Sequence, residues 1–87
     1  MPKVMIVDDD RNMVKLLQTL LTLDGFAVTH EAKAEAIMGA IRREKPDVVL
    51  MDKNLADADG IVLLREIRAD PEINRLPVVI ASGEDVG

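Results

Sequence analysis

The apolar run Val48-Val49-Leu50-Met51, which ends in Asp52, decides the predicted fold. A continuous apolar run is typical of a strand covered on both faces, as in the middle of a parallel sheet. The stretch that follows, residues 53–60, is polar and ends in Asp59-Gly60, so it is typical of a loop. Asp52 is therefore predicted at the carboxyl end of a central strand, where open α/β sheets bind ligands.

The rest of the chain alternates between strand and helix patterns. Short apolar runs predict further strands at residues 3–7, 26–30 and 77–81, the second of them at an edge because it is less apolar. Helices are predicted after the capping residue Asp10, at residues 33–44, and before the break at Asp70-Pro71. The order predicts one α/β domain, a doubly wound parallel sheet of four strands with three helices on its two faces.

Apolar residues at helical spacing predict the buried faces of these helices. The first face is predicted to comprise Met13, Leu16, Leu17, Leu20 and Leu21. The second is predicted to comprise Ala36, Ile37, Ala40 and Ile41, and the third Ile61, Leu64 and Ile67. Asp24-Gly25 is predicted to end the first helix, with the glycine in a left-handed conformation.

Composition narrows the function classes. The chain has 87 residues, 48% of them hydrophobic, and a single aromatic residue, Phe26, so the core must be aliphatic. No cysteine is present, which excludes disulfides and thiolate metal sites. The net charge of −5 argues against nucleic-acid binding by this chain alone. No apolar run approaches the length of a membrane span and no signal peptide opens the sequence, so the expected location is the cytoplasm.

Polar side chains end three of the predicted strands. They are Asp8 and Asp9 after the first strand, Asp52 after the third and Ser82 after the fourth. In a parallel sheet these ends lie along one rim. Converging carboxylates repel one another and need a cation, and all-oxygen ligands favour Mg²⁺. A carboxylate beside that metal can also act as a nucleophile and form an aspartyl-phosphate.

On these residues the whole chain resembles the receiver domains of bacterial two-component response regulators. The matching pieces are residues 4–9, 48–52, 59–60 and 78–83. The resemblance implies a flavodoxin-like fold in which Asp52 accepts a phosphoryl group from a partner histidine kinase. It implies that Asp9, helped by Asp8, binds Mg²⁺ near Asp52, that Asn54 offers the metal its backbone carbonyl, and that Ser82 is the hydroxyl that turns towards the phosphate.

The sequence departs from the family's pattern in two places. Ala56 stands where the family commonly has a proline. The family also continues with a helix, a fifth strand that starts with an invariant lysine, and a last helix, so we expect an incomplete, C-terminally truncated receiver domain at residues 1–87. Lys53 follows Asp52 directly and is predicted to point away from the site. The exposed edge of the fourth strand and the bared apolar surface of the first helix predict homo-oligomerisation.

Three functions remain open. The leading one is a signalling phosphoacceptor, not an independent enzyme, whose phosphotransfer and dephosphorylation are at most self-catalysed. The second is a pseudo-receiver that has lost phosphorylation and acts by dimerising or docking, which the missing lysine favours. The third is a metal-dependent phosphatase with an aspartyl nucleophile, which is weaker because Asn54 stands where such sites have a second acid. His30 is interpreted as a solvated or packed imidazole rather than a phosphodonor.

Overall fold

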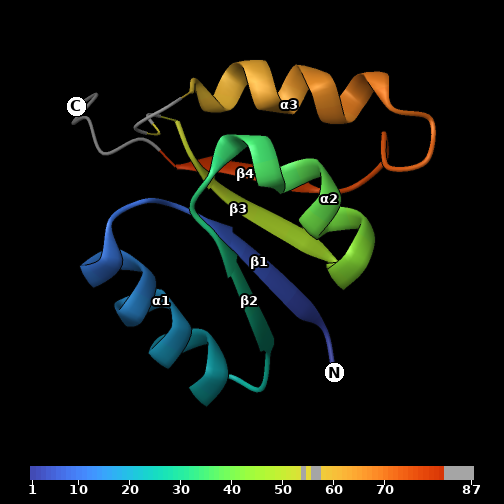
Figure 1. Ribbon diagram of the computed structural model, residues 1–87. Helices are drawn as coiled ribbons and strands as arrows, with labels where there is room; N and C mark the ends of the chain where they lie inside the picture. Colours follow the sequence, from blue (N-terminus) through green and yellow to red (C-terminus); the bar gives the residue numbers. More distant parts are fainter. Residues whose placement is uncertain (54, 56–57, 82–87) are drawn as a thin grey trace.

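The protein folds as a parallel sheet with helices on both faces (Figure 1). The computed structural model describes residues 1–53, 55 and 58–81. Its strands run in the order β2-β1-β3-β4, so β2 is at an edge as predicted. The elements are β1 Lys3–Val7, α1 Arg11–Leu23, β2 Ala27–Glu31, α2 Ala34–Glu44, β3 Val48–Asp52, α3 Gly60–Ala69 and β4 Val78–Ala81. The predicted fold class and element order are confirmed.

Strand β1 is buried on both faces, which makes it the centre of the core. Met5 and Val7 join one cluster with β3, α2 and α3. Val4 and Ile6 point to the opposite face and pack with Val14 of α1. Successive side chains of a strand alternate between faces, so only an unbroken apolar run can bury both. Figure 1 shows the resulting layers, with α1 on one side of the sheet and α2 and α3 on the other.

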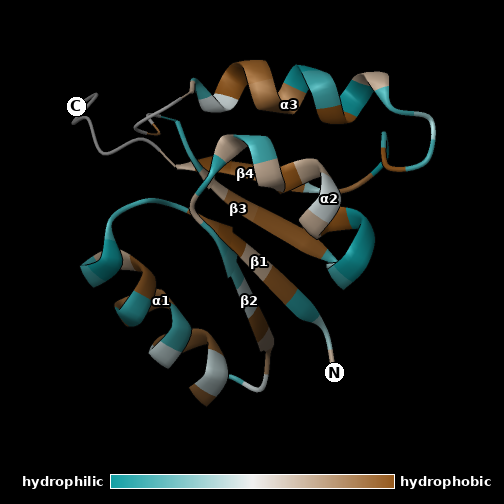
Figure 2. Ribbon diagram, in the orientation of Figure 1, coloured by the Kyte–Doolittle hydropathy of each residue, from teal (hydrophilic) through white to brown (hydrophobic). Residues whose placement is uncertain are grey.

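The two faces of β3 are covered unequally. Val49 and Met51 are fully buried beneath α2 and α3. Val48 and Leu50 face the α1 side and are only partly buried. On the neighbouring strand β4, Val79 pairs with Leu50 and is 51% exposed. The α1 side of the sheet is therefore covered over β1 and β2 but more open over β3 and β4. Figure 2 shows that much of β3 carries the hydrophobic colour.

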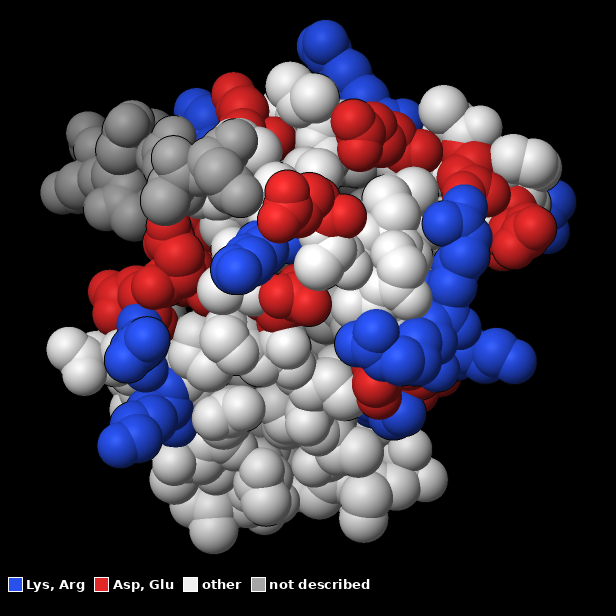
Figure 3. All heavy atoms as spheres, in the orientation of Figure 1, with Lys and Arg blue, Asp and Glu red and all other residues white. Residues whose placement is uncertain are grey.

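The predicted buried face of α1 was partly wrong. Val14 is buried, and Leu17 and Leu21 pack against its cluster. Met13, Leu16 and Leu20 are instead 43%, 53% and 52% exposed. Five leucines spread the apolar arc of this helix more widely than one sheet face can cover, so periodicity alone did not locate the contact. Figure 3 shows the consequence, an uncharged surface over the C-terminal half of α1 and the start of β2.

The predictions for the other helices are closer. In α2, Ile37, Ala40 and Ile41 are buried as expected. In α3 the residues that contact the core are Leu63 and Ile67, whereas the predicted Leu64 is only partly buried. Helix α1 begins after Asp10, whose side chain accepts from two backbone N–H groups, and ends before Gly25 at φ 91°, both as predicted.

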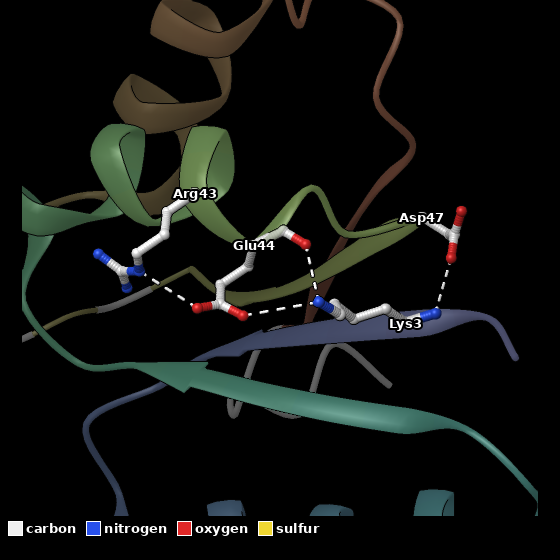
Figure 4. Close-up of polar contacts among 4 residues, drawn as sticks. All are labelled: Lys3, Arg43, Glu44 and Asp47. Carbon is white, nitrogen blue, oxygen red and sulfur yellow. Dashed lines mark hydrogen bonds and ion pairs between the residues drawn. The ribbon is translucent and has the colours of Figure 1, made fainter.

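A polar cluster fastens the amino ends of β1 and β3 (Figure 4). The backbone N–H of Lys3 donates to Asp47 Oδ2 at 2.7 Å, and the N–H of Asp47 donates back to the Lys3 carbonyl at 2.8 Å. The Nζ of Lys3 donates to the Glu44 carbonyl at 2.9 Å and lies 3.6 Å from its carboxylate. These groups are partly solvated, so they fix the register of the strands more than they add stability.

The hydroxyl of Thr29 on β2 is buried without a hydrogen-bond partner among the described residues. A buried hydroxyl without a partner loses its hydration and gains nothing in return. We expect Thr29→Val to raise the free energy of unfolding by about 1 kcal/mol, measured by urea denaturation. Thr19→Val is the matched control, because the Thr19 hydroxyl donates to the Lys15 carbonyl on an exposed helix face. Equal gains in the two variants would contradict this explanation.

Gly60 lets α3 start against the end of β3. A Cβ at this position would lie 2.5 Å from the carbonyl oxygen of Asp52, and the Gly60 N–H donates to the Lys53 carbonyl at 2.7 Å. We expect Gly60→Ala to lower the free energy of unfolding by about 1–3 kcal/mol, because the backbone must move apart.

Gly39→Ala in α2 is the control, since a Cβ there meets nothing within 4 Å. This variant should raise stability by about 0.5–1 kcal/mol. Urea denaturation of the two variants gives the comparison, and a Gly60→Ala protein as stable as wild type would show that the contact can relax freely.

Candidate functional site

The structure brings three aspartates together at the carboxyl ends of β1 and β3. The parallel register places Val7 opposite Met51, so Asp8 and Asp9 follow β1 where Asp52 ends β3. One carboxylate oxygen from each of the three lies within 4.8 Å of the others. Within the described part of the chain this is the one such group of potential metal ligands. The backbone pairing of two apolar strands thus imposes the proximity.

The site has an excess of negative charge. Asp8 is buried, at 9% exposure, and its Oδ1 accepts from the Asp10 N–H at 2.9 Å. Burial raises the pKa of Asp8 above its ordinary value, and the charge of Asp52 raises it further, while the Asp10 N–H partly offsets both. Both effects that raise this pKa disfavour the charged carboxylate, burial by removing water and Asp52 by placing a like charge nearby. A cation at the three oxygens would favour the charged form instead.

The adjacent Asp10 has a separate, structural task. Its Oδ1 accepts from the N–H groups of Asn12 at 3.0 Å and Met13 at 3.2 Å, which caps α1. A side-chain cap satisfies backbone donors that have no partner within the helix. The acidic run at residues 8–10 therefore divides between the site and the helix start.

The end of β3 is held from β4 and from α3. Asp52 pairs with Ala81 in the register, and the N–H of Lys53 donates to the Ala81 carbonyl at 2.9 Å. Asp59 caps α3 by accepting from the Ile61 N–H at 2.8 Å. Asn54 and Ser82 lie outside the described residues, and their roles stay predictions.

Sequence reasoning missed a contact made by His30. Its Nε2 lies 3.0 Å from the carbonyl oxygen of Asp8. The signal was its place near the carboxyl end of the strand beside β1, on the rim where the acids gather. Without the order of the strands, a single histidine in an edge strand could not be connected to the acidic run.

The donor set fits Mg²⁺. All three groups are carboxylates, and Mg²⁺ prefers oxygen ligands at about 2.1 Å in an octahedron, so opposite ligands lie about 4.2 Å apart. Neighbouring ligands in the same octahedron lie about 3 Å apart. The oxygens of Asp8, Asp9 and Asp52, which lie within 4.8 Å of one another, would therefore draw together around the ion. Asp8, Asp9 and Asp52 are therefore the residues that would hold the ion.

A separate hollow lies away from the three aspartates. It is about 690 Å³ and is lined by the end of α2 and the connection from α3 to β4. Its Arg42 already pairs with Asp70 and Glu72. This hollow is remote from the carboxyl ends of the strands, and we assign it no part in the chemistry.

No helix among the described residues is both long enough and apolar enough to cross a membrane.

Known proteins resemble this chain over most of its length. The family model described as "Response regulator receiver domain" matches residues 4–86. The transcriptional regulatory protein KdpE of Staphylococcus aureus is 39% identical over 80 residues, which are 92% of this chain and 33% of that protein. YxdJ of Bacillus subtilis is 38% identical over 84 residues, 97% of this chain and 37% of that protein. The chain thus spans about a third of the length of these relatives.

Solved structures show the same fold. A putative response regulator from Chloroflexus aurantiacus superposes with a TM-score of 0.89 at 28% identity, covering 99% of this chain and 72% of that one. The BeF3-activated receiver domain of Klebsiella pneumoniae RstA superposes with a TM-score of 0.86 at 31% identity, covering 95% and 68%. With the matched family model spanning nearly all of its length, the chain belongs to the response regulator receiver domain family.

Proposed function

We propose that this receiver domain accepts a phosphoryl group on Asp52 from a partner histidine kinase, with Mg²⁺ held by Asp8, Asp9, Asp52 and the backbone carbonyl of Asn54. The observation that supports this most directly is the approach of three carboxylate oxygens to within 4.8 Å at the ends of two adjacent strands. Two solved relatives are a BeF3-activated RstA receiver domain and a phosphorylated phytochrome response regulator, so related domains occur in such states.

The chemistry follows from the position of Asp52. A carboxylate oxygen of Asp52 attacks the phosphorus of the donor, the bond from phosphorus to the donor's leaving atom breaks, and an acyl phosphate forms on Asp52. Attack by water then returns the carboxylate and inorganic phosphate. When bound, Mg²⁺ offsets the charge that builds on the phosphoryl oxygens. Asp8 and Asp9 would hold the ion, and without it their negative charges would repel the incoming phosphoryl group. Ser82 is proposed to donate to a phosphoryl oxygen.

In this proposal the domain is a signalling module and not a classical enzyme. Its partner supplies the phosphoryl group, and its net charge of −5 argues against nucleic-acid binding by this chain alone. The proposal also locates it in the cytoplasm, without a membrane partner. A phosphatase remains the weaker alternative because Asn54 cannot act as the second acid such an enzyme needs.

Phosphorylation can be tested with a small phosphodonor. We expect acetyl phosphate with Mg²⁺ to add one phosphate to the wild-type protein, seen by intact-mass spectrometry. Asp52→Asn should abolish the adduct, because an amide is too weak a nucleophile. Asp9→Asn should slow its formation by weakening the metal site, and EDTA should prevent it.

Asp59→Asn is the control, because it changes an exposed acid that caps α3 and leaves the three clustered aspartates intact. A folded wild-type protein that gains no phosphate would refute the phosphoacceptor proposal and favour the docking module. An adduct that persists in Asp52→Asn would place the acceptor elsewhere.

We also propose that the chain self-associates through the edge of β4, the property on which a docking module would depend. Strand β4 ends the sheet, and Pro77 and Ala81 direct their carbonyls to β3. In a parallel ladder the alternate residues, Val78 and Ile80, then direct their backbone groups outward. A second copy, turned about a two-fold axis, can pair antiparallel with this edge, since an isologous contact needs only one strand.

Sedimentation velocity at micromolar concentration tests this pairing. We expect a wild-type dimer, and a monomer for Val79→Lys, because two lysines would oppose each other across the paired edges. Val62→Lys is the control, since Val62 on α3 is 50% exposed, almost the same as Val79 at 51%. A monomeric wild type, or equal effects of the two lysines, would count against pairing through β4.

A further inference from the structure

The side chain of His30 links the edge strand to the acidic site. His30 lies one residue before the end of β2, opposite Ile6 in the parallel register. Its Nε2 is 3.0 Å from the carbonyl oxygen of Asp8, and a carbonyl only accepts, so Nε2 carries the proton and donates. The paired register ends at Val7 and Glu31. The imidazole therefore extends the connection between β1 and β2 by one residue, onto the acidic run.

This hydrogen bond fixes one particular peptide plane. The carbonyl of Asp8 belongs to the planar unit that joins Asp8 to Asp9. Rotation of that unit changes the backbone angles on both sides and so redirects the side chains of both residues. The carboxylate of Asp8 is held separately, by the Asp10 N–H at 2.9 Å. Asp8 is thus restrained through its side chain and, by His30, through its main chain.

The restraint acts against a repulsive force. The carboxylates of Asp8, Asp9 and Asp52 share one sign of charge and lie close together, so Coulomb repulsion drives them apart. The segment from Asp8 to Asp10 connects β1 to α1 and belongs to neither, which leaves its backbone freer to yield than a strand. His30 is exposed, and it lines a hollow with Arg11, Val14 and Lys15 of α1.

We propose that His30 is a positioning residue: by donating to the Asp8 carbonyl it holds the Asp8–Asp9 peptide in the orientation that presents both carboxylates to a divalent cation. Partners beyond the direct ligands of a metal commonly fix ligand orientation in this way. Holding the peptide before the ion arrives reduces the ordering that binding requires. The inference rests on the proposed function for its metal-binding consequence, and on geometry alone for its effect on the backbone.

Isothermal titration with Mg²⁺ tests the consequence for binding. We expect His30→Ala to raise the dissociation constant about threefold to tenfold, the range for losing one hydrogen bond. His30→Gln should restore most of the affinity, because its amide nitrogen can donate from nearly the place of Nε2. Gln18→Ala is the control, since Gln18 lines the same hollow without a described hydrogen bond to the acidic segment. Circular dichroism confirms that each variant is folded.

A metal-free measurement tests the backbone effect. The NMR order parameter of the Asp9 amide should fall in His30→Ala and recover in His30→Gln. The proposal would be overturned if His30→Ala and His30→Gln weakened Mg²⁺ binding equally, or if the order parameter did not change. A role in packing alone predicts no such difference between the two variants. If wild type binds no Mg²⁺, the proposed function fails, while the order parameters still decide whether His30 holds the peptide.

Discussion

The structure depends on the parallel pairing of β1 with β3. Both strands are apolar and β1 is buried on both faces, so their register is fixed by the core and cannot shift without moving whole sets of side chains to the wrong face. That register sets Val7 beside Met51 and brings Asp8 and Asp9 to Asp52. The hydrophobic effect thus holds three like charges together, which their own electrostatics oppose.

Several contacts around the three aspartates hold the backbone and side chains in place against this electrostatic repulsion. The Asp10 N–H holds the Asp8 carboxylate, and Gly60 allows α3 to begin against the Asp52 backbone. At the other end of the sheet, Lys3 and Asp47 exchange hydrogen bonds that fix where β1 and β3 start. None of these contacts supplies a net positive charge at the acids. Burial raises the pKa of Asp8 and the nearby carboxylate of Asp52 raises it further, so a cation bound at the site would stabilise the charged form of Asp8.

Much of this was predictable from the sequence, because strand alternation and strand ends are local patterns. The run at residues 48–52 predicted a central strand and the run at residues 3–7 a further strand, and the aspartates at their carboxyl ends predicted the acidic rim. The buried face of α1 was not predictable in detail. Met13, Leu16 and Leu20 fit the helical period as well as Val14 and Leu17 do, and only the placement of the helix over β1 and β2 separates them. The contact of His30 required the strand order, which is a property of the whole fold.

The unequal cover of the sheet connects this fold to the site. Strand β4 is packed on the α2 and α3 side through Val78 and Ile80, while Val79 on its other side is half exposed. The same strand pairs with the end of β3, where Ala81 lies opposite Asp52. Strands packed on one face open more readily than strands packed on two. Any surface that came to lie over Val79 and Leu50 would therefore also steady the end of β3, so cover of the open face and order at Asp52 are physically coupled.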